Sequence, residues 1–176
     1  QLTSSRLGIL GMGRIGRAVA DRARSFGMKI HYHNRSQLDK NLEKGAIYHN
    51  SLESLCSVSD FFSINCPATK ETKHIINKKT LSYFPSGAVL SNSARGDMID
   101  DEAMVMALKS GKIYSLGLDV YNGEPNIHPE YLKLPNVFVL PHIGSSTITT
   151  RTAMGNLAVS NLEEFFKAGK CKNTVN

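Results

Sequence analysis

Three side chains in the sequence could together carry out acid–base chemistry on a small organic acid. Arg95, Glu124 and His142 each lie in a short segment punctuated by glycine or proline. A guanidinium binds a carboxylate through two parallel charged hydrogen bonds. An imidazole transfers protons near neutral pH, and a neighbouring carboxylate favours its protonated form. Taken singly, each residue also has a structural interpretation: a surface ion pair for Arg95, a turn for Glu124, and a cap or core position for His142.

A glycine-rich segment near the N-terminus predicts a binding site for a diphosphate. It reads Gly-Met-Gly-Arg-Ile-Gly over residues 11–16, follows an apolar run and opens a helical pattern. In this context Gly11 permits a tight turn, Gly13 lets the backbone approach a pyrophosphate, and Gly16 lets the helix pack closely on the strand. A turn without a ligand is the structural alternative. The amides at the start of the helix are expected to bind the phosphates, so the candidate cofactor-binding residues are Gly11, Gly13, Arg14, Ile15 and Gly16.

The end of the next apolar segment favours NADP(H) as the dinucleotide. A domain that prefers NAD usually has Asp or Glu there, which accepts hydrogen bonds from the ribose hydroxyls. This sequence has the neutral Asn34, followed by Arg35 and Ser36. Asn34 does not repel a 2′-phosphate, Arg35 can bind it through two charged hydrogen bonds, and Ser36 can add a third. An ordinary surface arginine is the alternative, and NAD(H) remains possible.

The elements that must position these residues alternate along the chain. Short apolar runs predict strands, and amphipathic segments predict helices opened by Ser51 and by Asp100 or Asp101, with Gly111 at a helix end. This alternation predicts an α/β fold: a Rossmann-type, doubly wound, mostly parallel sheet with helices on both faces. Ligands of such sheets bind at the carboxyl ends of the strands, where all the candidate residues would lie. The predicted strands are 6–10, 29–33, 61–64, 88–90, 114–120 and 137–140, and the predicted helices are 14–26, 51–58, 101–109 and 147–167.

Composition excludes several classes of function. The 176 residues carry 21 Lys and Arg against 15 Asp and Glu, and the two signs are interspersed, so we expect no nucleic-acid partner. No apolar run approaches the roughly 20 residues that cross a bilayer, so we expect no membrane partner. His31 and His33 share a strand face, but no carboxylate or thiol ligands lie near them in the sequence, and no metal site is predicted. Three scattered cysteines, Cys56, Cys66 and Cys171, indicate a reducing compartment, the cytoplasm.

Four motifs in order resemble the D-isomer-specific 2-hydroxyacid dehydrogenase family along essentially the whole chain. They are the glycine loop, N-x-A-R-G at 92–96, L-D-V-Y-x-x-E-P at 118–125, and P-H-I-G-S at 141–145. The resemblance implies hydride transfer between NAD(P) and a small 2-oxo or 2-hydroxy acid. It implies that Arg95 binds the substrate's carboxylate and carbonyl oxygen, that His142 is the general acid, and that Glu124 orients His142. Asn92 and Ser93 are expected to support the backbone near Arg95.

The resemblance also implies further cofactor contacts and a branch of the family. Asp119 is expected to hold the nicotinamide carboxamide, Cys66 and Pro67 to pass beside the cofactor, and Gly144 to contact it. The pairing of Asn-Arg-Ser with the three acid–base residues is most similar to the glyoxylate/hydroxypyruvate reductase branch. The formate dehydrogenase branch is disfavoured, because it should carry Gln in place of Glu124. An NAD-linked phosphoglycerate or D-lactate dehydrogenase, a corepressor-like module that senses nucleotides, and a bare regulatory domain are the alternatives.

The predicted organisation has two parts. Residues 1–146 form the dinucleotide-binding domain, and residues 147–176 form a helix and tail that return toward a substrate domain whose larger, N-terminal part is absent. The resemblance implies that the isolated chain binds cofactor but turns over substrate poorly. It also implies a homodimer. The apolar face of the 147–167 helix contributes to that dimer or packs back on its own sheet.

Overall fold

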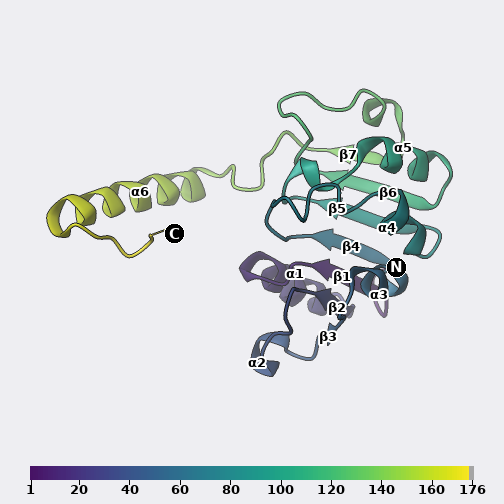
Figure 1. Cartoon of the computed structure of the whole chain (residues 1–176), viewed down its shortest axis with the longest axis horizontal. Helices are drawn as coiled ribbons and strands as arrows, with labels where there is room; N and C mark the ends of the chain where they lie inside the picture. Colours follow the sequence, from purple (N-terminus) through teal and green to yellow (C-terminus); the bar gives the residue numbers. More distant parts are fainter. Residues whose placement is uncertain (175–176) are drawn as a thin grey trace. The chain divides into compact units, whose positions relative to one another are not determined.

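The computed structural model describes residues 1–174 and contains a parallel sheet of seven strands (Figure 1). Every pair of neighbouring strands is parallel, in the order β3-β2-β1-β4-β5-β6-β7. The predicted fold class is confirmed. The strands are β1 (Arg6–Leu10), β2 (Lys29–His33), β3 (Ile47–Tyr48), β4 (Phe61–Ile64), β5 (Ala88–Asn92), β6 (Ile113–Leu118) and β7 (Val137–Val139).

Helices cover both faces of this sheet. Side chains of β1 alternate, so Leu7 and Ile9 pack with α1 on one face, whereas Leu10 joins the core of the other face. On that second face α3 packs against α4 and α4 against α5, as Figure 1 shows. The helices of the sheet are α1 (Arg14–Ser25), α2 (Lys40–Glu43), α3 (Leu52–Val58), α4 (Lys78–Tyr83) and α5 (Asp101–Lys109), with 3₁₀ turns at Gly96–Met98 and Tyr131–Lys133.

Local capping explains where the predicted helices begin and end. The Ser51 side chain accepts a hydrogen bond from the amide of Ser54 at the start of α3. Asp100 does the same for Ala103 at the start of α5. The cap at the end of α5 is Ser110, and Gly111 follows it with a φ of +74°. The predicted glycine at this helix end is confirmed, because the left-handed position directly follows the C-cap.

Two predicted strand ends were wrong, and several short elements were not predicted. β6 ends at Leu118 rather than at residue 120, because its pairing with β5 and β7 ends there. β5 extends to Asn92, two residues beyond the prediction. Five short elements were not predicted from the sequence: α2, β3, α4 and both 3₁₀ turns. These elements have six residues or fewer, which is too short for a hydrophobic period to be recognised.

The chain divides into two compact units, Gln1–His142 and Ile143–Asn176, and each is described by itself. The second unit contains α6 (Ile148–Ala168), which is capped by the Thr147 side chain and ends at Gly169 with a φ of +68°. The predicted division after residue 146, with a tail returning toward a substrate domain, stays a prediction. None of the helices within residues 1–174 has the length and apolar character needed to span a bilayer.

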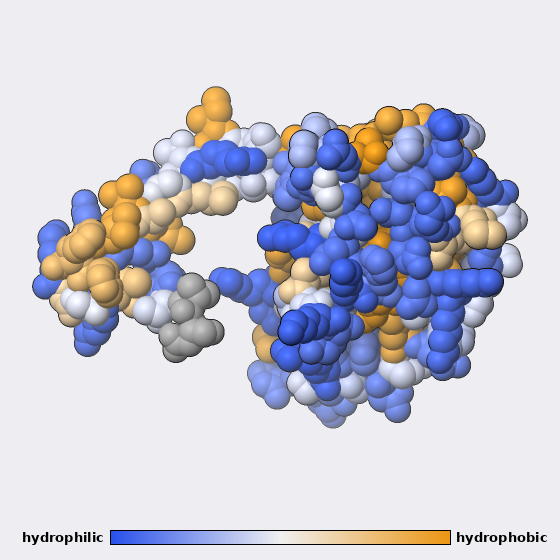
Figure 2. Space-filling view, turned by 45° about the horizontal axis from the view of Figure 1, so that its top comes forward, coloured by the Kyte–Doolittle hydropathy of each residue, from blue (hydrophilic) through white to orange (hydrophobic). Residues whose placement is uncertain are grey.

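The surface of the first unit is mostly hydrophilic on the face shown in Figure 2, with a few exposed apolar side chains. Phe138 on β7 and Leu132 in the preceding 3₁₀ turn are about two-thirds exposed, at 65% and 64%. The buried apolar side chains instead form the two layers between sheet and helices.

Candidate active site

The carboxyl ends of the parallel strands place the candidate residues of the first unit along one edge of the sheet. β1 leads into Gly11, β4 into Cys66, β5 into Arg95, β6 into Asp119 and β7 into His142 within a few residues. The chain leaves β1 toward β2 on one side, and β4 leads toward β7 on the other. Such a point of reversal leaves a crevice between the first loops, where α/β sheets bind ligands.

The glycine loop has the geometry that a diphosphate site requires. A side chain at Gly16 would meet the carbonyl oxygen of Gly11 at 2.4 Å, so the helix packs directly on the loop. A side chain at Gly13 would meet nothing within 4 Å, which leaves room for a phosphate against the backbone. Gly13 is the N-cap of α1. Because glycine has no side chain, this residue does not cap the first amides of the helix. Arg14 and Ile15, in the first turn, are exposed. These residues fit a dinucleotide.

Gly11 also connects this loop with the segment after β4. Gly11 has a φ of +91°, and a side chain there would lie 2.4 Å from the amide nitrogen of Cys66. Cys66 therefore lies directly beside the glycine loop, and its predicted cofactor contact, like that of Pro67, stays a prediction. Burial raises the pKa of the Cys66 thiol, which favours its neutral form.

The end of β2 carries the residues predicted to select the dinucleotide. Asn34 Oδ1 accepts a hydrogen bond of 2.7 Å from the amide of Met12, which ties this strand end to the glycine loop. Arg35 and Ser36 follow and are exposed. The pKa of Glu71 is lowered mainly by a hydrogen bond with Thr69, and the charge of Arg35 contributes to the same shift. A guanidinium and a hydroxyl are thus available next to the loop.

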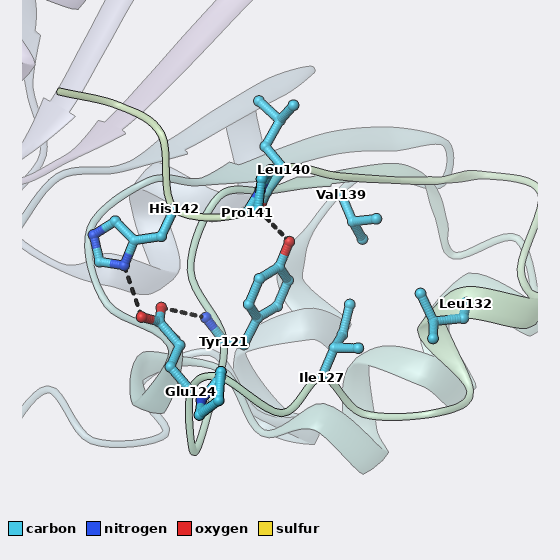
Figure 3. A pocket seen from close by; sticks show the side chains of 9 residues that line it. Tyr121, Glu124, Ile127, Leu132, Val139, Leu140, Pro141 and His142 are labelled. Carbon is cyan, nitrogen blue, oxygen red and sulfur yellow. Dashed lines mark hydrogen bonds and ion pairs between the residues drawn. The ribbon is translucent and has the colours of Figure 1, made fainter. Parts of the chain in front are cut away.

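Glu124 and His142 form the acid–base pair of the site. His142 Nδ1 donates to Glu124 Oε2 over 2.7 Å, and Glu124 Oε1 accepts from the amide of Tyr121 over 3.0 Å (Figure 3). The hydrogen bond from His142 is the main reason that the pKa of Glu124 is lowered, and the charge of Arg95 contributes to the same shift. The side chains are 49% exposed for His142 and 35% exposed for Glu124. The carboxylate thus holds the imidazole while solvent and ligand can reach it.

Arg95 is held beside this pair by its own loop. The buried Asn92 accepts from the amide of Ala94 and donates to the carbonyl of Arg95, so the expectation that it supports this backbone is confirmed. The same expectation for Ser93 stays a prediction. The Arg95 side chain is exposed, and its Nη1 donates to the carbonyl of Ala94 over 2.6 Å.

Two residues that hold the site together had no role in the sequence analysis. Gly96 packs so closely on the next loop that an added Cβ would lie 1.9 Å from the carbonyl carbon of Tyr121. Tyr121 donates its hydroxyl to the carbonyl of Leu140, which joins the loops after β6 and β7. Both residues were part of the motifs, and a glycine directly after a charged candidate was the available signal. The contact itself joins segments far apart in sequence.

Asp119 and Gly144, two further residues predicted to bind the cofactor, lie in different units of the chain. Asp119, at the end of β6, is 8% exposed, and its amide donates to the carbonyl of Asn92. It therefore joins the start of the segment that carries Glu124 to the end of β5, just before Arg95. Gly144 belongs to the second unit, so its predicted contact with the cofactor stays a prediction.

A mostly apolar pocket of about 370 Å³ adjoins the acid–base pair. Glu124 and His142 lie at one end of it, and Tyr121, Ile127, Leu132 and Val139 are among the side chains that line the rest (Figure 3). None of the predicted cofactor-binding residues lines this pocket. The pocket is therefore a separate feature from the glycine loop.

Three histidines cluster at the β2–β3 edge, away from the acid–base pair in sequence. His31 Nδ1 lies 2.9 Å from His49 Nε2, His49 Nδ1 contacts Ser54 Oγ at 2.7 Å, and His33 Nδ1 contacts the carbonyl of His49 at 2.7 Å. Within residues 1–174 no group of three or more His, Cys, Asp or Glu side chains is arranged to hold a metal ion.

Comparison with known proteins identifies close relatives over this region. The model of the family described as "D-isomer specific 2-hydroxyacid dehydrogenase, NAD binding domain" matches residues 1–144. A glycerate dehydrogenase from Hyphomicrobium methylovorum is 44% identical over 168 residues, which are 94% of this chain and 52% of that protein. A glyoxylate reductase from Paecilomyes thermophila has a similar structure, with a TM-score of 0.95 and 46% identity over 99% of this chain and 53% of that one.

A third relative was crystallised with a dinucleotide. An NADPH-dependent glyoxylate/hydroxypyruvate reductase from Sinorhizobium meliloti, in complex with NADP and malonate, has a TM-score of 0.94 and 37% identity. The match covers 99% of this chain and 54% of that chain. The chain thus spans about half the length of the relatives it matches.

Proposed function

Because the chain belongs to the D-isomer specific 2-hydroxyacid dehydrogenase family, we propose that it is the cofactor-binding part of an enzyme that interconverts small 2-oxo and 2-hydroxy acids. Glyoxylate and hydroxypyruvate are the proposed 2-oxo acids. The observation that carries this proposal is the 2.7 Å hydrogen bond between His142 and Glu124, at the sheet edge that also carries Arg95 and the glycine loop.

The proposed cofactor is NADP(H), which supplies or accepts the hydride when it is bound. Gly11, Gly13, Arg14, Ile15 and Gly16 would hold its diphosphate through the amides of α1. Arg35 and Ser36 would bind the 2′-phosphate, and the neutral Asn34 leaves that phosphate without a repelling carboxylate. The relative from Sinorhizobium meliloti, described as NADPH-dependent, supports this preference over NAD(H).

Each acid–base residue has a distinct proposed role. Arg95 would bind the carboxylate of the substrate through its exposed guanidinium. Glu124 accepts the hydrogen bond from Nδ1 of His142, so Nε2 is the nitrogen that can give a proton to the carbonyl oxygen and take it back in the reverse reaction. Asp119, Cys66 and Pro67 would line the nicotinamide side of the crevice.

Calorimetric titration of the chain with NADPH and with NADH tests the cofactor. We expect tighter binding of NADPH and a loss of that preference in Arg35→Ala, because one charged contact changes affinity by about tenfold or more. Arg22→Ala is a suitable control, since Arg22 donates to the carbonyl of Ala18 within α1. Equal or tighter binding of NADH by the parent chain would contradict the preference, and binding of neither would contradict the proposed function.

Turnover is tested by following NADPH oxidation with glyoxylate or hydroxypyruvate. The chain spans about half the length of its relatives, so we expect binding without efficient turnover, because positioning and exclusion of water account for many orders of magnitude in rate. A rate comparable with that of a full-length relative would contradict this expectation. We further propose a cytoplasmic location, because the cysteines are scattered and free. We also propose that the protein forms a homodimer and has neither a nucleic-acid nor a membrane partner.

A further inference from the structure

The loop that carries Arg35 and Ser36 is anchored at both of its ends. On the β2 side, Asn34 binds the amide of Met12 in the glycine loop, and the Tyr48 hydroxyl lies 3.4 Å from the carbonyl of Asn34. On the other side, the chain enters α2 through Gln37 and Leu38. Both Arg35 and Ser36 are exposed between these two anchors. The position of their backbone therefore depends on how firmly each anchor is held.

The second anchor is a buried network around the carboxylate of Glu43. Tyr32 is fully buried and donates its hydroxyl to Glu43 Oε1 over 2.6 Å. Gln37 Nε2 donates to the same oxygen over 2.8 Å. The Tyr32 hydroxyl also accepts a hydrogen bond of 3.0 Å from the amide of Leu38. One carboxylate and one hydroxyl thus hold two successive residues of the loop.

The charge of Glu43 is stabilised where it lies. Glu43 is only 8% exposed, and burial of a charged group is costly unless hydrogen bonds compensate for it. The hydrogen bonds from Tyr32 and Gln37 lower the pKa of Glu43, so it remains ionised near neutral pH. Burial raises the pKa of Tyr32 to about 12, so its hydroxyl remains a donor. Arg24 Nη2 donates to the Glu43 carbonyl over 2.7 Å and fixes the end of α2 to α1.

We infer that Tyr32 and Glu43 are positioning residues for selection of the dinucleotide, acting through Gln37 and Leu38 on the backbone of Arg35 and Ser36. This inference rests on the proposed function, because it assumes that Arg35 and Ser36 bind the 2′-phosphate. The diphosphate site does not depend on the network, since the glycine loop is held by Asn34 and by the carbonyl of His33. Loosening the network therefore weakens NADPH binding more than NADH binding.

The test compares the dissociation constants of NADPH and NADH for the chain and two variants. Tyr32→Phe removes the hydrogen bonds of the hydroxyl with Glu43 and with the amide of Leu38. Gln37→Ala removes only the hydrogen bond from Gln37 to Glu43. We expect the NADPH constant to rise about threefold to tenfold in Tyr32→Phe and less in Gln37→Ala, while the NADH constant changes by less than about twofold. Gln37→Ala keeps the test valid if Tyr32→Phe fails to fold, because Gln37 is exposed.

Tyr131→Phe is the matched control. Tyr131 is also buried, at 3% exposure, and donates its hydroxyl to the carboxylate of Asp101 over 2.9 Å, far along the chain from Arg35. This variant loses a comparable hydrogen bond and is expected to keep the ratio of the two constants. A preference for NADPH that survives both Tyr32→Phe and Gln37→Ala would overturn this inference alone. A parent chain that binds NADH more tightly would overturn the cofactor proposal and this inference together.

Discussion

Gly96 connects two loops of the candidate site through close backbone packing. Its backbone lies against the loop that contains Tyr121, and that contact brings Arg95 next to Glu124. The sequence predicted Arg95, Glu124 and His142 from their chemistry and their motifs. It did not predict the contact at Gly96, because close packing between loops after different strands leaves no local pattern.

Replacement of this glycine by alanine should therefore destabilise the chain. In Gly96→Ala the new methyl group would overlap backbone atoms of Tyr121, which cannot move as a flexible side chain can. We expect a loss of about 1–3 kcal/mol in the free energy of unfolding, measured by urea denaturation. Gly117→Ala is the control, because a Cβ there meets nothing closer than the Ser91 side chain at 3.9 Å. Equal losses in the two variants would contradict the packing argument.

The hydrogen bond between His142 and Glu124 should be visible in the titration of the carboxyl. Its pKa lies below the ordinary 4.5, so ionised Glu124 favours the folded state above that pH. This contribution is lost as the pH falls through the lowered value. In His142→Ala we expect the pKa of Glu124 to rise toward 4.5, measured by carbon-13 NMR of the carboxyl.

The neighbouring donors make this rise incomplete. The Tyr121 amide and the charge of Arg95 still lower the pKa of Glu124 in that variant. Glu130, whose pKa is lowered to about 2 mainly by its hydrogen bond with Lys109, provides an internal control that should not move. An unchanged Glu124 titration would show that the imidazole does not hold this carboxylate.

Among the elements, those with local signals could be predicted and those formed by tertiary contacts could not. The predicted caps at Ser51 and Asp100 are encoded within three residues of the helix starts, and the structure has both. β3 has only two residues, and its pairing with His31 and Tyr32 of β2 defines it. The network around Glu43 likewise joins β2 to α2, so no periodicity in the sequence indicated it.

Helix capping gives a prediction with a matched pair of aspartates. Asp100 caps α5 through its side chain, whereas Asp39 occupies the N-cap of α2 without a side-chain cap. We expect Asp100→Ala to lower the free energy of unfolding by about 1 kcal/mol and Asp39→Ala by a few tenths. Thermal or urea unfolding of both variants measures the difference. A larger loss for Asp39→Ala would refute the assignment of the caps.

The edge formed by β2 and β3 should lose stability in mild acid. Burial lowers the pKa of both His31 and His49 from the ordinary 6.5. The unfolded chain then takes up protons before the folded chain does, so the free energy of unfolding falls as the pH falls below 6.5. Protonation of both rings would also remove the acceptor from their 2.9 Å hydrogen bond.

The charged neighbours of this pair do not reverse the effect. Arg6 and Lys29 lower the pKa of His31, and Asp60 raises it, with burial as the largest influence. We expect His31→Gln to make the free energy of unfolding less dependent on pH below 6.5, measured by urea denaturation across a pH series. His74→Gln, outside the cluster, serves as the control. A parent chain whose stability stays constant over this range would rule out the effect.

At the scale of the whole molecule, the proposed homodimer can be tested by measuring the mass of the chain in solution. This chain spans about half the length of the relatives it matches, and a homodimer is part of the proposed function. We expect sedimentation velocity to give twice the mass of 19.3 kDa at micromolar concentration. A chain that sediments at the monomer mass over the same range would argue against the dimer.

β1 precedes the other strands of the sheet along the chain and yet lies near its middle, where it pairs with β2 on one side and with β4 on the other. The β1–β4 junction is therefore a seam between two half-sheets. The glycine loop belongs to one half, and Arg95, Glu124 and His142 belong to the other. Partial separation along this seam would abolish the site while each half kept its own strand pairing, and a ligand bound across it would hold the halves together. Amide exchange in β4 should therefore slow most when a dinucleotide binds.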